Sequence, residues 1–195
     1  MRILSKRDVL FAIITGLIAG VLGAFILIFL RKTLPFGIQP IWLIPIIPLL
    51  WIAGIQLGYF LGRWIGFFDQ FGKFAAIGFT NFAVDSSILN LLIFLTGIAE
   101  GKEYALFKII SFIVAVVHSY FWNRAWTFQT KGSFAKFLLV MIASVLVNVA
   151  TASLVVNVIP HGGTSPEVWA NVGAIIGSAS ALIFSFVGFR LVVFK

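Results

Sequence analysis

The chain has 195 residues, of which 61% are hydrophobic and only 10% are charged. Soluble domains carry about 25% charged residues, so this composition excludes a soluble globular protein, whose surface could not remain so apolar. The chain has no cysteine, which excludes disulfides and thiolate metal sites. Its net charge is +8, but the basic residues are scattered along the sequence, which argues against a nucleic-acid-binding face.

Six apolar stretches follow one another, each of roughly 20 residues, which is the length of a helix that crosses a hydrocarbon core of about 30 Å. The first stretch is too long for the apolar region of a signal peptide and predicts an anchored helix. We therefore predict an all-α, polytopic membrane helix bundle of about six transmembrane helices. The stretches are Val9–Leu30, Ile41–Gly62, Phe74–Thr96, Tyr104–Trp122, Phe137–Ile159 and Val168–Phe189.

The second stretch contains Pro40, Pro45 and Pro48, which predict a bent helix packed against its neighbours or, as the alternative, a functional break. The segment from Arg63 to Lys73 is rich in aromatic residues and predicts a short interfacial helix. In the first stretch, glycines predict a face for close helix packing.

The Lys and Arg residues predict the orientation, because basic residues prefer the cytoplasmic side. With the N-terminus inside, the cytoplasmic side receives most of the 14 basic residues. We expect a multi-pass protein of the cell (cytoplasmic) membrane with both termini in the cytoplasm. The residues on the other side are Arg31, Lys32, Lys102 and Lys108.

The last four stretches look like two copies of one two-helix unit in the same orientation, which predicts two parallel two-helix repeats. The segment Phe71–Phe74 opens the third stretch, and the similar segment Phe134–Phe137 opens the fifth. The fourth and sixth stretches end in basic and aromatic residues. The alignment pairs Lys73 with Lys136, Asp85 with Asn148, Ala115 with Ala181, Ser119 with Ser185, and Arg124 with Arg190.

The segment Asn123-Arg124-Ala125-Trp126-Thr127-Phe128, together with Gly78-x-x-Asn81-x-x-x-Asp85 and Ile110–Ala115, resembles the GtrA-like family. The resemblance covers about residues 71–195 and leaves the first two stretches outside. It divides the chain into an N-terminal transmembrane hairpin extension, residues 1–66, and a GtrA-like four-helix transmembrane domain, residues 67–195.

The resemblance implies a role in cell-surface polysaccharide synthesis. Members of that family are associated with moving polyprenyl-phosphate-linked sugars across the membrane. We expect this translocation, with the sugar lipid and the bilayer as partners and no nucleic acid. The alternatives are a scaffold that partners a membrane glycosyltransferase and a small proton-coupled exporter. A homo-oligomer is left open.

Polar residues inside the apolar stretches are the first candidates for a substrate site, since ionisable groups are costly in a membrane. Asp85, Asn81 and Lys108 are expected to form a polar site for a headgroup or a proton, or else a tie between helices. His118 is a candidate proton relay or an interhelical hydrogen bonder. Ser119 and Asn148 complete this set, and Asn148 has the same interhelical alternative.

At the cytoplasmic side, Arg124 is expected to bind a lipid phosphate with bidentate hydrogen bonds, while Asn123 and Trp126 hold sugar or prenyl groups. Lys73, Lys136 and Arg190 extend this site as a basic collar, or alternatively anchor the chain to anionic lipids. No catalytic motif, metal-ligand cluster or phosphate loop is present in the sequence, so we expect neither an enzyme nor a cofactor or metal.

Overall fold

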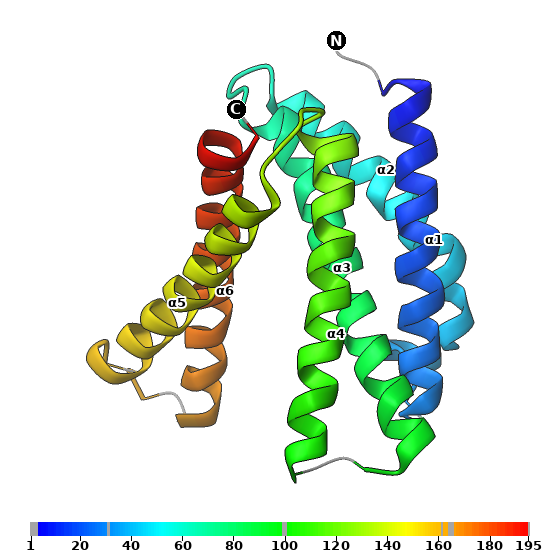
Figure 1. The fold of residues 1–195 in the computed structure, drawn as a ribbon, viewed down its shortest axis with the longest axis vertical. Helices are drawn as coiled ribbons and strands as arrows, with labels where there is room; N and C mark the ends of the chain where they lie inside the picture. The colour runs from blue at the N-terminus through cyan, green and yellow to red at the C-terminus, as the bar shows by residue number, and fades with distance from the viewer. Residues whose placement is uncertain (1–3, 31, 99–100, 161, 164–165, 195) are drawn as a thin grey trace. The chain divides into compact units, whose positions relative to one another are not determined.

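The computed structural model describes residues 4–30, 32–98, 101–160, 162–163 and 166–194, and these ranges contain helices and turns without a strand. Six α-helices follow the order of the six apolar stretches (Figure 1), which confirms the all-α bundle. They are α1 Lys6–Phe29, α2 Leu43–Leu61, α3 Phe68–Thr96, α4 Gly101–Trp122, α5 Phe134–Val158 and α6 Pro166–Gly188. Two short 3₁₀ helices lie between α1 and α2, namely η1 Pro35–Gly37 and η2 Pro40–Trp42. A π-helix follows α4 and another follows α6, namely η3 Asn123–Thr127 and η4 Phe189–Val193.

Five helical segments among the described residues are long and apolar enough to cross a membrane. They belong to α1, α2 with η2, α3, α5, and α6 with η4. The chain is therefore a multi-pass membrane protein. α4 has a similar length of 22 residues, with Lys102 and Glu103 in its first turn.

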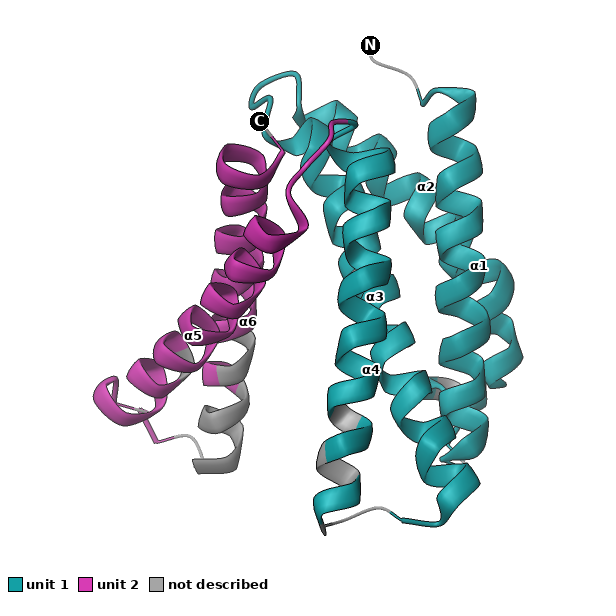
Figure 2. Ribbon diagram, viewed as in Figure 1, with its two compact units in different colours: residues 1–129 teal, residues 130–195 magenta. Residues whose placement is uncertain are grey.

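The helices form two compact units, residues 1–129 and 130–195 (Figure 2). Unit 1 contains α1 to α4 with η3, and unit 2 contains α5, α6 and η4. The division into residues 1–66 and 67–195 rests on the family resemblance and stays a prediction. Within unit 1, α1 and α2 pack on α3.

The backbones of α1 and α2 approach closely at two glycines of α1. A Cβ atom at Gly16 would lie 2.5 Å from the Cα of Pro48, and one at Gly20 would lie 2.6 Å from the carbonyl oxygen of Leu43. Pro48 lies inside α2, while η2 and its Pro40 precede the helix. The proline-containing half of α2 is thus the part that packs on the small face of α1, as membrane helices do at small residues.

The link between α2 and α3 differs from the prediction. The expected interfacial helix over residues 63–73 is not a separate element, because residues 62–67 form turns and α3 begins at Phe68. α3 is therefore 29 residues long and reaches past the predicted start of its apolar stretch. Of the aromatic side chains before Lys73, Phe68 and Phe71 belong to the first turns of α3, and Trp64 and Phe67 belong to the preceding turns.

A threonine ties three helices together in the middle of unit 1. The hydroxyl of Thr80 on α3 lies 2.8 Å from the carbonyl oxygen of Ala76 and 3.3 Å from that of Thr15 on α1. The mid-span tryptophan Trp51 on α2 donates its indole N–H to the same hydroxyl oxygen at 3.3 Å. In a membrane, such polar contacts between helices replace the hydrogen bonds that water would otherwise supply.

The two predicted repeats have the same backbone irregularity at the same aligned position. α4 ends in the π-helix η3, which is closed by the N–H of Phe128 on the carbonyl of Asn123 at 2.9 Å. α6 ends in the π-helix η4, which is closed by the N–H of Phe194 on the carbonyl of Phe189, also at 2.9 Å. A π-helix is rare and favours functional positions, so its recurrence supports the duplication of a two-helix unit.

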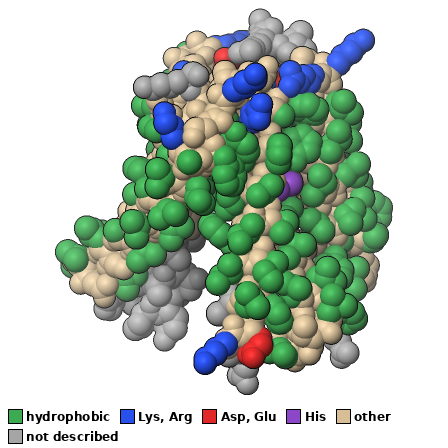
Figure 3. Space-filling view, viewed as in Figure 1, with side chains coloured by type: hydrophobic (Ala, Val, Ile, Leu, Met, Phe, Trp, Pro, Cys, Tyr) green, Lys and Arg blue, Asp and Glu red, His purple; other side chains and the backbone are tan. Residues whose placement is uncertain are grey.

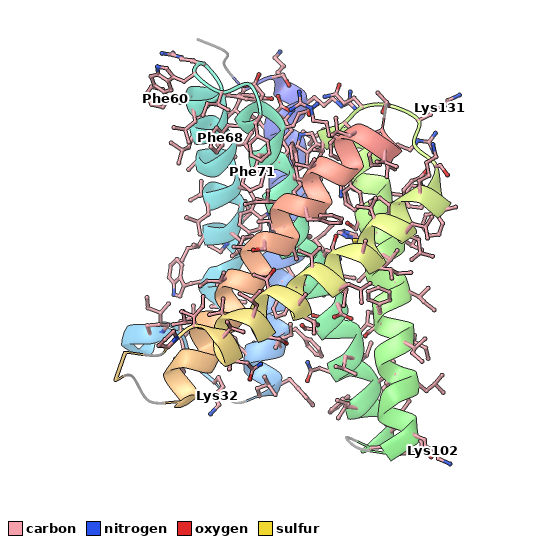
Figure 4. All side chains as sticks on the ribbon, turned by 90° about the vertical axis from the view of Figure 1, so that its left-hand side faces the viewer. Lys32, Phe60, Phe68, Phe71, Lys102 and Lys131 are labelled. Carbon is pink, nitrogen blue, oxygen red and sulfur yellow. The ribbon has the colours of Figure 1, made fainter. Side chains whose placement is uncertain are left out.

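Hydrophobic side chains cover the flanks of both units (Figure 3). In unit 1, Phe60, Phe68 and Phe71 lie towards one end, and Lys32 and Lys102 lie at the other (Figure 4). We call the end of unit 1 near Phe60, Phe68 and Phe71 the Asp8 end, because Asp8 lies there in the first turn of α1. At this end α1 and α3 begin, and α2 and α4 end.

Gly16→Ala tests the close packing of α1 on α2. The added methyl group meets proline backbone, and overpacking of this kind costs about 1–3 kcal/mol, more than the gain of about 1 kcal/mol in helix propensity. We expect a lower unfolding temperature of the purified protein in detergent. The matched control is Gly54→Ala on α2, where a Cβ would meet no atom within 4 Å. Equal effects of the two substitutions would contradict the packing assigned here.

Candidate functional site

The most polar interior of unit 1 surrounds the carboxylate of Asp8. The Nζ of Lys73 on α3 lies 2.6 Å from its Oδ1, and the indole N–H of Trp126 on η3 donates to the same oxygen at 3.0 Å. Its Oδ2 accepts hydrogen bonds at 2.8 Å from the hydroxyls of Tyr59 on α2 and Ser5. Asp8 is 6% exposed and Lys73 is 4% exposed. One side chain thus joins four elements.

Local sequence places Asp8 at this point. Ser5 is the N-cap of α1 and accepts from the backbone N–H of Asp8, while Asp8 accepts from the backbone N–H of Ser5. This capping box holds the carboxylate beside the first turn. The positive end of the helix dipole and the Lys73 ammonium both favour a negative charge there.

The start of α1 also holds the π-helix η3 through two further contacts. The guanidinium of Arg7 donates to the carbonyl oxygen of Ala125 and lies over the ring of Phe11. Phe11 packs edge-on against Trp122 and Trp126, with ring centroids 5.4 and 5.9 Å apart. The N-terminal extension therefore fixes the segment that contains the family motif.

Two side chains of η3 are buried with an oxygen atom that has no partner. Asn123 is 1% exposed and donates its Nδ2 to the carbonyl and hydroxyl of Ser119, but its Oδ1 is unpaired. Thr127 is 2% exposed and its hydroxyl oxygen is also unpaired. An unpaired buried polar atom costs about 1–3 kcal/mol, so these two oxygens are candidates for contact with a bound hydroxyl group or water.

Further polar atoms lie along the α3–α4 hairpin. Both ring nitrogens of the half-buried His118 and the Oδ1 of the half-buried Asn81 are buried without a partner. Towards the middle of the helices, the hydroxyl of Ser111 donates to Oδ1 of Asp85 at 2.7 Å. Asn81, Asp85, His118, Ser119 and Asn123 thus lie on one hairpin. The side chain of Lys108, on α4, lies outside the described residues.

The predicted basic collar is divided by the structure. Lys73 is buried and its ammonium is paired with Asp8, so in this structure it does not offer a free cation to the predicted collar. The sequence could not show this because Asp8 lies outside the family resemblance. Lys136 and Arg190 are exposed, and Arg124 is half-buried. Only these three remain available to a lipid phosphate.

The structure also places two other predicted site residues, Trp126 and Asn148. Trp126 is fully buried and its indole N–H is bonded to Asp8, so it has no free surface for a sugar or prenyl group. Asn148 is half-buried on α5 in unit 2. The roles proposed for the predicted site residues stay predictions.

Asp8 was not among the predicted site residues. The available signal was an acidic residue three positions after a serine, directly before an apolar run, which is the pattern of a capping box. An acidic residue near an apolar stretch needs a partner because a charge in the membrane is costly. The chain has only six acidic residues, so each of them could be considered in turn.

Lys73→Met tests the buried pair. Removing one partner of a buried ion pair leaves an uncompensated charge and destabilises by about 3–5 kcal/mol, whereas removing both charges is close to neutral. We expect a large loss of thermal stability in detergent for Lys73→Met and for Asp8→Leu. The double variant should recover most of that loss. Additive losses in the double variant would show that the two groups do not act as a pair.

Comparison with known proteins places the sequence in a family. The family model described as GtrA/DPMS, transmembrane domain, matches residues 73–194. The match begins at Lys73 and includes α4, α5, α6 and both π-helices. No solved structure matches the chain. Because the family model covers more than half of the sequence, the chain belongs to the GtrA/DPMS transmembrane-domain family.

Proposed function

We propose that the protein moves the headgroup of a polyprenyl-phosphate-linked sugar across the membrane. The family associates the chain with glycan synthesis that involves lipid-linked sugars. In this proposal the prenyl chain stays in lipid while the sugar phosphate follows polar side chains of the α3–α4 hairpin. The chain makes and breaks no covalent bond, and the Asp8 end faces the cytoplasm, in agreement with its basic residues.

The observation that carries the proposal is a set of buried polar atoms without a partner on the α3–α4 hairpin and η3. The set comprises the Thr127 hydroxyl, Oδ1 of Asn123, the ring nitrogens of His118 and Oδ1 of Asn81. From Asn123 to His118 the helix rises by roughly 8 Å, about a quarter of the hydrocarbon core. Polar atoms in such a place are costly unless a ligand or water satisfies them.

The chemistry of these atoms suits a sugar. Asn81 and Asn123 offer carbonyl oxygens that accept hydrogen bonds, while neutral histidine and threonine both donate and accept. Sugar hydroxyl groups also donate and accept, so these atoms suit hydrogen bonds to a sugar headgroup. The half-buried guanidinium of Arg124 lies next to Asn123 in sequence and suits the phosphate through bidentate hydrogen bonds.

Asn123→Leu tests the role of the unpaired oxygen atom of Asn123. The substitution removes the unpaired acceptor and fills its space, and we expect about a tenfold loss of headgroup movement, the size of effect that follows when one buried hydrogen bond is lost. The assay uses liposomes that contain polyprenyl-phosphate-linked hexose, and it measures the fraction of the sugar that reacts with impermeant periodate outside. The matched control is Asn157→Leu, because Asn157 is exposed and already donates to the carbonyl of Ser153.

Arg124→Ala is compared with Lys131→Ala in the same assay. We expect a larger loss for Arg124, since Lys131 is exposed and lies in the connection before α5. If the wild-type protein moves no headgroup, the translocation proposal fails. Co-purification with a glycosyltransferase, together with activity that tolerates Asn123→Leu, would favour the scaffold instead.

A further inference from the structure

The two repeats differ in what covers one face. In unit 1, α1 lies on the face of α3, α4 and η3 that includes Lys73 and Thr80. Its contacts reach Lys73 and Trp126 through Asp8, Ala125 through Arg7, Trp122 through Phe11, and Thr80 through Thr15.

The repeat alignment identifies the equivalent face in unit 2. Pairing Lys73 with Lys136 also pairs Thr80 with Ala143, and pairing Arg124 with Arg190 pairs Trp122 with Gly188, Ala125 with Leu191, and Trp126 with Val192. All five of these unit 2 residues line one groove of about 410 Å³ between α5 and α6. The groove therefore occupies the position that α1 occupies in unit 1.

The groove is apolar with one cation at its end. Lys136 is exposed, as are Leu139, Leu191 and Val192, at 66%, 55% and 47%. Lys136 occupies the position of Lys73, whose charge is neutralised by the carboxylate of Asp8. The small residue Ala143 in the groove would let another helix approach closely, while Gly188 already packs against Val140 of α5.

We infer that this groove, lined by Lys136, Ala143, Gly188, Leu191 and Val192, is a docking site for a transmembrane helix of a partner protein. The helix carries a carboxylate in its first turn, which pairs with Lys136, and a face of small residues like that of α1. In α1 the buried residues are Asp8, Ala12, Thr15, Gly16, Ala19, Gly20 and Ala24.

Within each unit, the described acidic residues have positions or partners other than this one. Asp8 is bonded to Lys73, and Asp85 accepts from Ser111 in the middle of α3. Asp69 precedes Lys73 on α3 by one helical turn and approaches the backbone of Gly62. Glu103 and Glu167 belong to the first turns of α4 and α6, at the ends of the hairpins opposite Lys73 and Lys136, and Glu100 lies outside the described residues. The helix is therefore expected from a different polypeptide.

The test uses a synthetic peptide of residues 1–30 of this chain as the probe helix, since it is the helix seated on the equivalent face. The full-length protein and the peptide are reconstituted in phosphatidylcholine vesicles. Because the chain has no cysteine, Ala143→Cys in the protein and Thr15→Cys in the peptide report docking by disulfide formation under mild oxidation. This pair reproduces the contact between Thr80 and Thr15 in unit 1.

We expect crosslinking from Ala143→Cys and about tenfold less from Val145→Cys, which is exposed on the other face of α5. Lys136→Gln should reduce the yield by about tenfold, and Lys131→Gln should leave it unchanged. The peptide variant Asp8→Asn should cause the same loss with the protein unaltered, so misfolding of a protein variant cannot account for it. Lys136→Asp combined with the peptide variant Asp8→Lys should restore the yield.

Equal crosslinking at Ala143→Cys and Val145→Cys would overturn the inference, as would yields that do not depend on Lys136 or on the peptide carboxylate. Loss of crosslinking when phosphatidylglycerol is added, without any dependence on the peptide carboxylate, would assign the groove to an anionic lipid. Exchange of the peptide between copies of the chain plays no part in these outcomes, because the cysteine at position 143 reports only on unit 2. The result does not depend on whether the protein translocates sugars.

Discussion

The carboxylate of Asp8 is the group on which the architecture of unit 1 depends. A charge removed from water in a membrane needs both an opposite charge and hydrogen bonds, and Asp8 obtains them from Lys73, Trp126, Tyr59 and Ser5. These donors come from three other elements and from the N-cap of α1 itself. The geometry is satisfied only when α1, α2, α3 and η3 are assembled together, so this contact specifies their arrangement in a way that apolar packing between helices in lipid does not.

This dependence gives the N-terminal extension a structural role. The family match begins at Lys73, yet the ammonium of that residue and the indole N–H of Trp126 both find their partner in α1. The extension therefore completes the first repeat and fixes the π-helix. It holds η3 from the side of Ala125 and Trp126, while the unpaired oxygens of Asn123 and Thr127 remain available within the same five residues.

Sequence reasoning could predict the helices, the duplication and the family because each leaves a local signal. Apolar length marked the helices, and aligned basic and aromatic residues such as Arg124 and Arg190 marked the duplication. It could not predict the partner of Lys73, since charge pairing between residues 65 positions apart depends on the fold rather than on spacing. The role of Trp126 was missed for the same reason. The start of α3 was misplaced because hydropathy does not distinguish an interfacial helix from the first turns of a spanning helix.

The duplication also explains why the two halves of the family domain need not do the same work. At the aligned positions of the two π-helices, Asn123 and Thr127 of the first correspond to Phe189 and Val193 of the second, which are equally buried but apolar. Phe189 stacks on Phe137 at 4.3 Å between ring centroids and contacts Phe194, so the second π-helix is filled by aromatic packing. The first π-helix has polar side chains at these positions and is covered by α1, whereas the second has apolar side chains there and the aligned face of unit 2 contains the groove. The π-helix therefore occurs in both repeats, beside buried polar side chains in the first and beside an apolar groove in the second.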